Sequence, residues 1–159
     1  MSDAITITTY DPATDYAAVT DLWRRSGLVL YPIDSAARLA RAAAANAGLF
    51  LVARDGARVV GAVLGTTDGR ALWVQHLAVD EAYRRQGLAG RLLDILEAEA
   101  RARDLGAMLL LVLDENTGAV RFYERRGWLT APGVRFMVYP LREEAGGDAA
   151  DAPRERDAS

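Results

Sequence analysis

The apolar positions of the chain alternate with polar ones at its start and then change to a helical period. The alternating, β-branched run at 5–10 predicts a strand. Apolar side chains then recur at helical spacing over 16–25, which predicts a helix that ends at Gly27. A second helix is expected to begin with Asp34 or Ser35 as its cap and to continue through the alanine-rich stretch that follows.

Three short apolar runs follow the two helices and predict an antiparallel meander. They cover 49–53, 59–64 and 71–79. The first two are separated by Arg-Asp-Gly-Ala at 54–57, a turn sequence typical of a β-hairpin. A further glycine turn leads into the third run, so three consecutive antiparallel strands are expected.

The second half of the chain predicts a crossover unit and a closing pair of strands. An amphipathic helix is expected over 88–103, and the continuous apolar run at 108–113 is typical of a strand covered on both faces. A helix between two strands implies a parallel crossover. A shorter helix is expected over 117–126, followed by strands at 128–130 and 134–139.

These elements predict one α/β (α+β) domain over residues 1–142. Its centre would be a mixed, mostly antiparallel sheet of six to seven strands flanked by about four helices. A chain of 159 residues with 51% apolar composition is enough for one ordinary core. Residues 143–159 have no apolar period and are expected to form a disordered tail.

Composition excludes several kinds of chemistry. The chain has no cysteine, and all 19 basic residues are arginine, so disulfides, thiolate nucleophiles, a Walker-type lysine and Schiff-base catalysis are excluded. A single histidine without cysteine does not make a usual zinc site, so no metal is expected. The net charge of -3 and pI near 5.2 argue against nucleic-acid binding. The N-terminus has no leader pattern and no run is long enough to span a membrane, so a cytoplasmic location is expected.

The turn before the long helix has the properties of an anion site. It reads Arg84-Arg85-Gln86-Gly87-Leu88-Ala89-Gly90 and opens directly into the helix. Unpaired N–H groups and the positive end of the dipole lie at a helix N-terminus, and small residues let a phosphate approach them. The competing interpretation is that Gly87 only shapes a turn and the arginines are solvated. A dinucleotide fold is disfavoured because Gly-x-Gly-x-x-Gly is absent.

The stretch from Leu77 to Leu93 resembles the coenzyme A signature of the GNAT superfamily of N-acetyltransferases. Its core pattern, Arg/Gln-x-x-Gly-x-Gly/Ala, is met by Arg84, Gly87 and Ala89. The order of expected elements is also similar to the GNAT fold over nearly all of the chain before the tail. The resemblance implies acetyl-CoA as cosubstrate, with its pyrophosphate on main-chain amides of 85–90.

The resemblance also implies that the pantetheine arm pairs with the main chain of Leu77 and Val79 like an added strand. The coenzyme-binding residues that it implies are Leu77, Ala78, Val79, Arg84, Arg85, Gln86, Gly87, Leu88, Ala89, Gly90, Asn116, Ala119 and Phe122.

Residues 114–128 resemble the second recurring GNAT segment, Asn-x-x-Ala-x-x-Phe-Tyr-x-x-x-Gly-Phe, with Trp128 in the place of the last phenylalanine. Asn116 is either a helix cap or a partner of the pantetheine amides. Ala119 and Phe122 would form core or coenzyme wall. The resemblance assigns to Tyr123 the role of general acid, because a phenol with a pKa of about 10 is protonated at neutral pH and can supply a proton to the departing thiolate.

The general base is not evident from the sequence. Many GNAT enzymes use a glutamate on the strand before Leu77, but residues 71–79 include no carboxylate. His76 is the candidate base, since an unperturbed imidazole has a pKa of about 6.5. The alternative is a structural histidine. Strict alternation would put His76 on the face opposite Leu77 and Gln75. The resemblance also implies an acceptor pocket that would include Trp23, Tyr31, Asp34 and Arg135.

The sequence therefore predicts an N-acetyltransferase that moves an acetyl group from acetyl-CoA to a primary amine by direct attack in a ternary complex. The acceptor would be a small-molecule or peptide amine, and the protein a monomer or homodimer without nucleic-acid or membrane partners. The alternatives are a non-catalytic acyl-CoA-binding module and an interaction domain whose arginines bind a phosphate or carboxylate.

Overall fold

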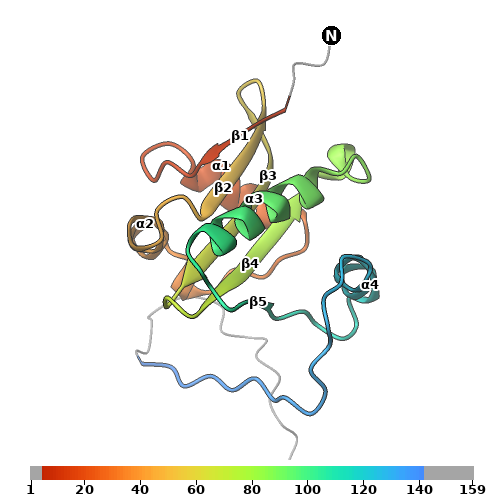
Figure 1. Ribbon diagram of the computed structural model, residues 1–159. Helices are drawn as coiled ribbons and strands as arrows, with labels where there is room; N and C mark the ends of the chain where they lie inside the picture. Colours follow the sequence, from red (N-terminus) through yellow and green to blue (C-terminus); the bar gives the residue numbers. More distant parts are fainter. Residues whose placement is uncertain (1–4, 142–159) are drawn as a thin grey trace, which may run out of the picture.

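The computed structural model of the protein describes residues 5–141 and has a five-stranded sheet between two layers of helices (Figure 1). The strands lie in sequence order: β1 (Thr6–Thr9), β2 (Phe50–Asp55), β3 (Arg58–Thr67), β4 (Ala71–Val79) and β5 (Ala107–Leu110). The first four are antiparallel neighbours, and β4 and β5 are parallel. The mixed, mostly antiparallel sheet is confirmed.

Helices cover the two faces of the sheet separately. They are α1 (Tyr16–Arg25), α2 (Ala36–Ala45), α3 (Leu88–Ala102) and α4 (Thr117–Arg125), with short 3-10 turns η1 (Pro32–Asp34) and η2 (Glu81–Tyr83). In one core cluster, Leu92, Leu93 and Leu96 of α3 pack on the sheet. The other places Leu22 and Trp23 of α1 against the opposite face, with α2 beside them. The predicted βαβ crossover is β4–α3–β5.

The closing strands predicted at 128–130 and 134–139 are wrong. In the described part of the chain no strand follows β5, and the segment after α4 runs as an extended trace apart from the sheet (Figure 1). Its apolar side chains are solvated, with Phe136 69% and Met137 82% exposed. An alternating apolar run becomes a strand only where a ladder partner lies alongside it. The sheet therefore has fewer strands than predicted.

The strand predicted at 108–113 is also shorter and less covered than expected. It ends at Leu110, and Leu111 and Leu113 beyond it are 58% and 69% exposed. A continuous apolar run indicates burial on both faces only if layers exist to cover both. Here α3 covers one face. The tail predicted at 143–159 lies outside the described residues. Within residues 5–141 no helix is both long and apolar enough to cross a membrane.

The close approach of Leu49, just before β2, and of α3 to Gly65 in β3 gives a test of the packing. A Cβ atom there would lie 2.8 Å from the main-chain oxygen of Leu49 and 3.1 Å from a methyl of Leu96. Because a main-chain atom cannot move aside cheaply, we expect Gly65→Ala to lower the free energy of unfolding by about 1–3 kcal/mol in urea titration. The matched control is Gly118→Ala in α4, where no atom lies within 4 Å of the added Cβ. It should be neutral or stabilise by about 0.5–1 kcal/mol.

Candidate active site

The two parallel strands at one edge of the sheet, β4 and β5, separate partway along their length. Their last paired residues are Val74 and Leu110, where β5 ends. Strand β4 continues to Val79, and beyond Val74 no strand of residues 5–141 pairs with its outer edge. Main-chain groups on that edge are therefore open to a ligand that can pair like a strand.

The main chain of β4 shows which residues face this open edge. The N–H of Asp80 donates to the oxygen of Val60 on β3 at 2.9 Å, and Ala78 is paired with β3 as well. Main-chain groups of successive strand residues alternate between the two edges. Leu77 and Val79 thus present their main chains to the open edge, while their side chains pack in the α3-side core. The main chain of Ala78 points the other way.

The turn that follows β4 leaves a run of main-chain amides without partners. Among the described residues, none accepts a hydrogen bond from the N–H groups of Arg85 through Gly90. Both Arg85 and Gly87 have a left-handed backbone conformation, with φ of 60° and 78° respectively. Gly87 is the N-cap of α3, makes no side-chain cap, and has nothing within 4 Å of the place of a Cβ. The predicted residues therefore form one exposed cradle of N–H donors.

Positive charge surrounds the cradle. The guanidinium of Arg84 donates from Nε to the oxygen of Val79 at 3.0 Å, which fixes this side chain beside the open edge. The guanidinium of Arg85 makes no ion pair within residues 5–141. The guanidinium of Arg91 donates a hydrogen bond to the main-chain oxygen of Ile5 at 3.2 Å. These charges add to the positive end of the α3 dipole, and an anion there is favoured electrostatically.

A further cation reaches the cradle from α4, which the sequence reasoning did not identify. Arg126, at the C-terminal end of α4, forms an ion pair with Asp94 of α3 and lies over the ring of Phe122 at 6.0 Å. One of its nitrogens is 3.0 Å from the place of a Cβ on Gly90. A side chain at Gly90 would displace it. No local sequence pattern reveals this contact, because the partners lie on two separate helices.

Asp80 anchors the start of the turn. This buried carboxylate accepts hydrogen bonds from Arg25 and Arg58, both at 2.8 Å, and from the main-chain N–H of Ala82 at 3.1 Å. The hydrogen bond from Arg25 is the main reason that the pKa of Asp80 lies below its usual value. The end of β4 is thereby tied to α1 and β3, which holds the cradle in place.

Helix α4 brings the other predicted segment toward the α3-side core. The side chain of Asn116 accepts the Ala119 N–H at 3.2 Å and so caps the helix. This bond uses the amide oxygen and leaves the amide nitrogen available. Ala119 and Phe122 are half-buried, and Phe122 packs against the α3-side core.

Tyr123 lies between two aromatic rings. Its ring contacts Phe122 and Trp128 edge-on at centroid distances of 5.2 and 5.3 Å. Burial raises the pKa of Tyr123 to about 12, because a phenolate is poorly solvated there. The hydroxyl therefore remains protonated at any physiological pH, and it makes no hydrogen bond to another described residue.

His76 lies on the opposite side of the sheet from α3. The centroid of its ring lies 4.7 Å from that of Trp23. Its Nε2 is 3.0 Å from Oδ1 of the buried Asp34. Sequence reasoning placed Trp23 and Asp34 near an acceptor pocket but missed their contact with His76, because 42 residues separate His76 from Asp34. The side chain of Tyr31 is exposed nearby, whereas Arg135 lies in the solvated segment after α4.

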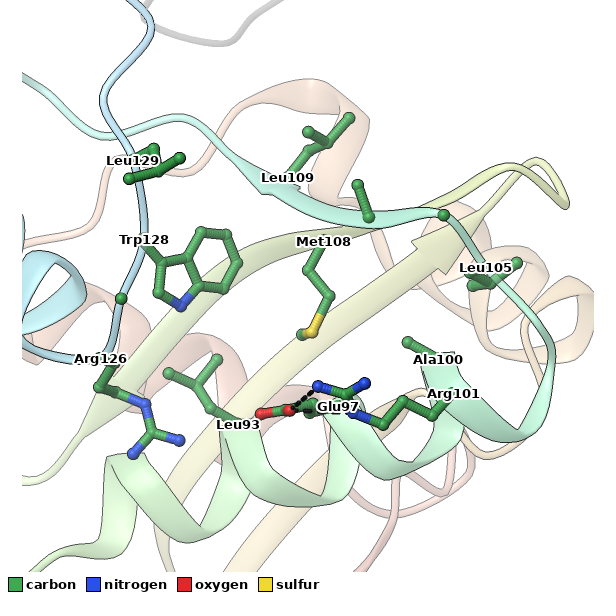
Figure 2. Close-up of a pocket in the computed structure, with 13 residues that line it drawn as sticks. Leu93, Glu97, Ala100, Arg101, Leu105, Met108, Leu109, Arg126, Trp128 and Leu129 are labelled. Carbon is green, nitrogen blue, oxygen red and sulfur yellow. Dashed lines mark hydrogen bonds and ion pairs between the residues drawn. The ribbon is translucent and has the colours of Figure 1, made fainter.

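A separate hollow lies beside α3. A cavity of about 480 Å³ is bounded by the C-terminal half of α3, the start of β5 and the segment after α4 (Figure 2). Leu93, Leu105, Met108 and Trp128 give it an apolar wall, and the rim includes the ion pair of Glu97 and Arg101. Arg126, which approaches Gly90 of the cradle, also lines this hollow, but none of the unpartnered amides of residues 85–90 does, so the hollow is distinct from the cradle.

Comparison with known proteins identifies the family of the chain. A sequence model of the acetyltransferase (GNAT) family matches residues 16–128. An acetyltransferase of Pectobacterium atrosepticum is 32% identical over 111 residues, which cover 70% of this chain and 79% of that protein.

Solved structures have the same fold. Ard1 of Thermoplasma volcanium is 26% identical with a TM-score of 0.67, over 81% of this chain and 86% of that one. PaiA N-acetyltransferase of Thermoplasma acidophilum, solved with coenzyme A, has a TM-score of 0.69 at 17% identity, over 78% of this chain and 89% of that one. The chain therefore belongs to the GNAT family and is an acetyltransferase.

Proposed function

We propose that the protein transfers the acetyl group of acetyl-CoA to a primary amine by direct attack within a ternary complex. The observation that carries this proposal is the run of unpartnered amides from Arg85 to Gly90 beside the open edge of β4. A cradle of donors at a helix N-terminus suits a pyrophosphate, and a free strand edge suits an amide-bearing arm. No covalent acyl-cysteine is available, since the chain has no cysteine.

The residues present fit the coenzyme. The amides of 85–90 would bind the pyrophosphate, with Arg85 and Arg126 supplying charge. Leu77 and Val79 would pair with the pantetheine arm through their main chains. The Val79 oxygen already accepts from Arg84, so the Val79 N–H and both groups of Leu77 carry this pairing. The coenzyme would supply an activated thioester whose carbonyl carbon an amine can attack.

Tyr123 would stabilise the departing sulfur. Its pKa of about 12 lies roughly 3.5 units above that of an ordinary thiol, so complete proton transfer to the sulfur is uphill by about 5 kcal/mol. The phenol therefore acts mainly as a neutral hydrogen-bond donor to charge that develops on sulfur. This refines the prediction from sequence, which assumed an unperturbed phenol. His76, near the predicted acceptor pocket, would accept the proton of the amine.

The acceptor class remains broad within primary amines. Structural neighbours with the same fold include a ribosomal-protein-S18-alanine N-acetyltransferase of Escherichia coli, at 22% identity and a TM-score of 0.62. They also include an aminoglycoside acetyltransferase from a soil metagenome, at 18% identity and a TM-score of 0.68. A suitable panel therefore holds an alanine-terminated peptide, an aminoglycoside, a polyamine and an aromatic monoamine, with thiol release as the readout.

The cradle is tested by Gly87→Glu in calorimetry with acetyl-CoA. A carboxylate at the N-cap of α3 would occupy the cradle and repel the pyrophosphate. We therefore expect the affinity for acetyl-CoA to fall at least 100-fold, which corresponds to about 2.8 kcal/mol of binding free energy. Gly69→Glu is the matched control. Gly69 has a similar φ of 88° and open space around it, but lies in the turn at the other end of β4. Unchanged binding by Gly87→Glu would remove the cradle as the phosphate site.

Tyr123→Phe tests the hydroxyl. A hydrogen bond to a charged group contributes about 1.5–3 kcal/mol, so we expect kcat to fall roughly 10- to 100-fold with the Kd for acetyl-CoA nearly unchanged. The control is Tyr10→Phe, which removes a buried hydroxyl that has no partner in the described part of the chain. It should leave kcat unaltered. Equal turnover by Tyr123→Phe would contradict the role assigned to the phenol.

A further inference from the structure

Strand β4 contains an irregularity at His76. Ala78 is paired with Ala62 and Gln75 with Leu64, so two residues, His76 and Leu77, lie opposite Val63. The φ of His76 is 50°, a conformation that costs a residue with a Cβ about 1 kcal/mol or more. A bulge of this kind redirects a side chain. Gln75 and His76 consequently both lean toward the α1 side, which departs from the strict alternation expected from the sequence.

The redirected ring meets a carboxylate that the linker between α1 and α2 holds rigidly. Asp34, in η1, is only 6% exposed. Its Oδ1 lies 3.0 Å from His76 Nε2, and its Oδ2 accepts the main-chain N–H of Tyr31 at 2.9 Å. The main-chain oxygen of Asp34 accepts a hydrogen bond from the hydroxyl of Tyr16 at 3.3 Å. Both carboxylate oxygens are therefore engaged, and the side chain has one orientation.

This geometry decides which nitrogen of His76 is free. A carboxylate only accepts hydrogen bonds, so Nε2 must carry the hydrogen and Nδ1 keeps the lone pair. The side chain of His76 is 21% exposed, so a small molecule or water can approach it. Trp23 covers the ring on one side. The ring is thus held in one tautomer by a buried acceptor, as in the His and Asp pair of hydrolytic triads.

We propose that Asp34 is a positioning residue that holds His76 with Nδ1 free to take the proton of the acceptor amine. This inference rests on the proposed function. The amine nitrogen forms the C–N bond, and the C–S electron pair leaves with sulfur. One proton moves from nitrogen to Nδ1, directly or through a water, and sulfur gains one proton from Tyr123 or water. Solvent then takes the proton from the imidazolium and restores that of the tyrosine.

The first test is spectroscopic and needs no substrate. His76 is the only histidine of the chain, so selective ¹⁵N labelling of an untagged protein gives one imidazole. We expect a ring N–H proton on Nε2 that is protected from exchange with water, and its loss in Asp34→Ala. A protected proton on Nδ1, or one that persists in Asp34→Ala, would overturn the pairing. Asp34→Asn, which can still accept from the Tyr31 N–H, covers the case in which Asp34→Ala does not fold.

The second test is a double-mutant cycle in turnover, using the amine of the panel that gives the fastest thiol release. Loss of a partner that orients a catalytic side chain typically costs 10- to 100-fold, so we expect Asp34→Asn to lower kcat by about this factor without raising the KM for acetyl-CoA. If Asp34 acts through His76, the double variant Asp34→Asn with His76→Ala should be no slower than His76→Ala alone. If the losses of kcat in the two single variants add in the double variant, Asp34 does not act through His76 and its role is merely structural.

Matched controls separate this proposal from the proposed function. Tyr16→Phe removes the hydroxyl bond to the Asp34 main chain and leaves the carboxylate and His76 untouched, so it should keep kcat within about twofold. Calorimetry with acetyl-CoA should give the same Kd for every variant. Coenzyme binding without turnover of any amine by the wild type would overturn the catalytic role and the acceptor assignment together. Turnover at the wild-type rate in His76→Ala would overturn only the role of the pair.

Discussion

The separation of β4 from β5 is the constraint on which the rest of the site depends. Parallel strands that stay paired satisfy each other's main-chain groups and leave nothing for a ligand. Here pairing stops at Val74 and Leu110, so the last residues of β4 keep an open edge. The turn that follows leads directly into α3, which puts the helix N-terminus and its unpartnered amides at the end of that edge. Main-chain donors, rather than particular side chains, thus define the proposed coenzyme site.

The sheet also keeps the two proposed proton-transfer groups on different elements. Tyr123 comes from α4 and packs with the α3-side core, whereas His76 leans toward α1 and η1. The end of β4 contributes to both environments, with Val79 in the α3-side core and Ala78 in the α1-side core, and there the bulge at His76 breaks the alternation of side chains. A positive φ at a residue other than glycine persists only where neighbouring contacts compensate it. The buried carboxylate of Asp34 and the ring of Trp23 supply such contacts.

Local patterns predicted most of the elements. The helices at 16–25 and 88–102, the hairpin at 54–57 and the crossover all arise from periodicity and turn residues, which act over a few positions. The closing strands at 128–130 and 134–139 failed because strand formation needs a partner edge as well as an apolar alternation. Likewise the apolar run after α3 predicts a strand covered on both faces, and only the arrangement of layers shows that its far end is solvated.

The sequence by itself determined the family, the small-residue turn and its arginines, because these depend on which residues follow one another. The tertiary structure alone decided that Arg126 reaches Gly90, that burial shifts the pKa of Tyr123 upward, and that Asp34 meets His76. Each of these depends on how distant segments pack. Desolvation and hydrogen bonding are set by the groups that surround a side chain in space, and no spacing along the chain specifies them.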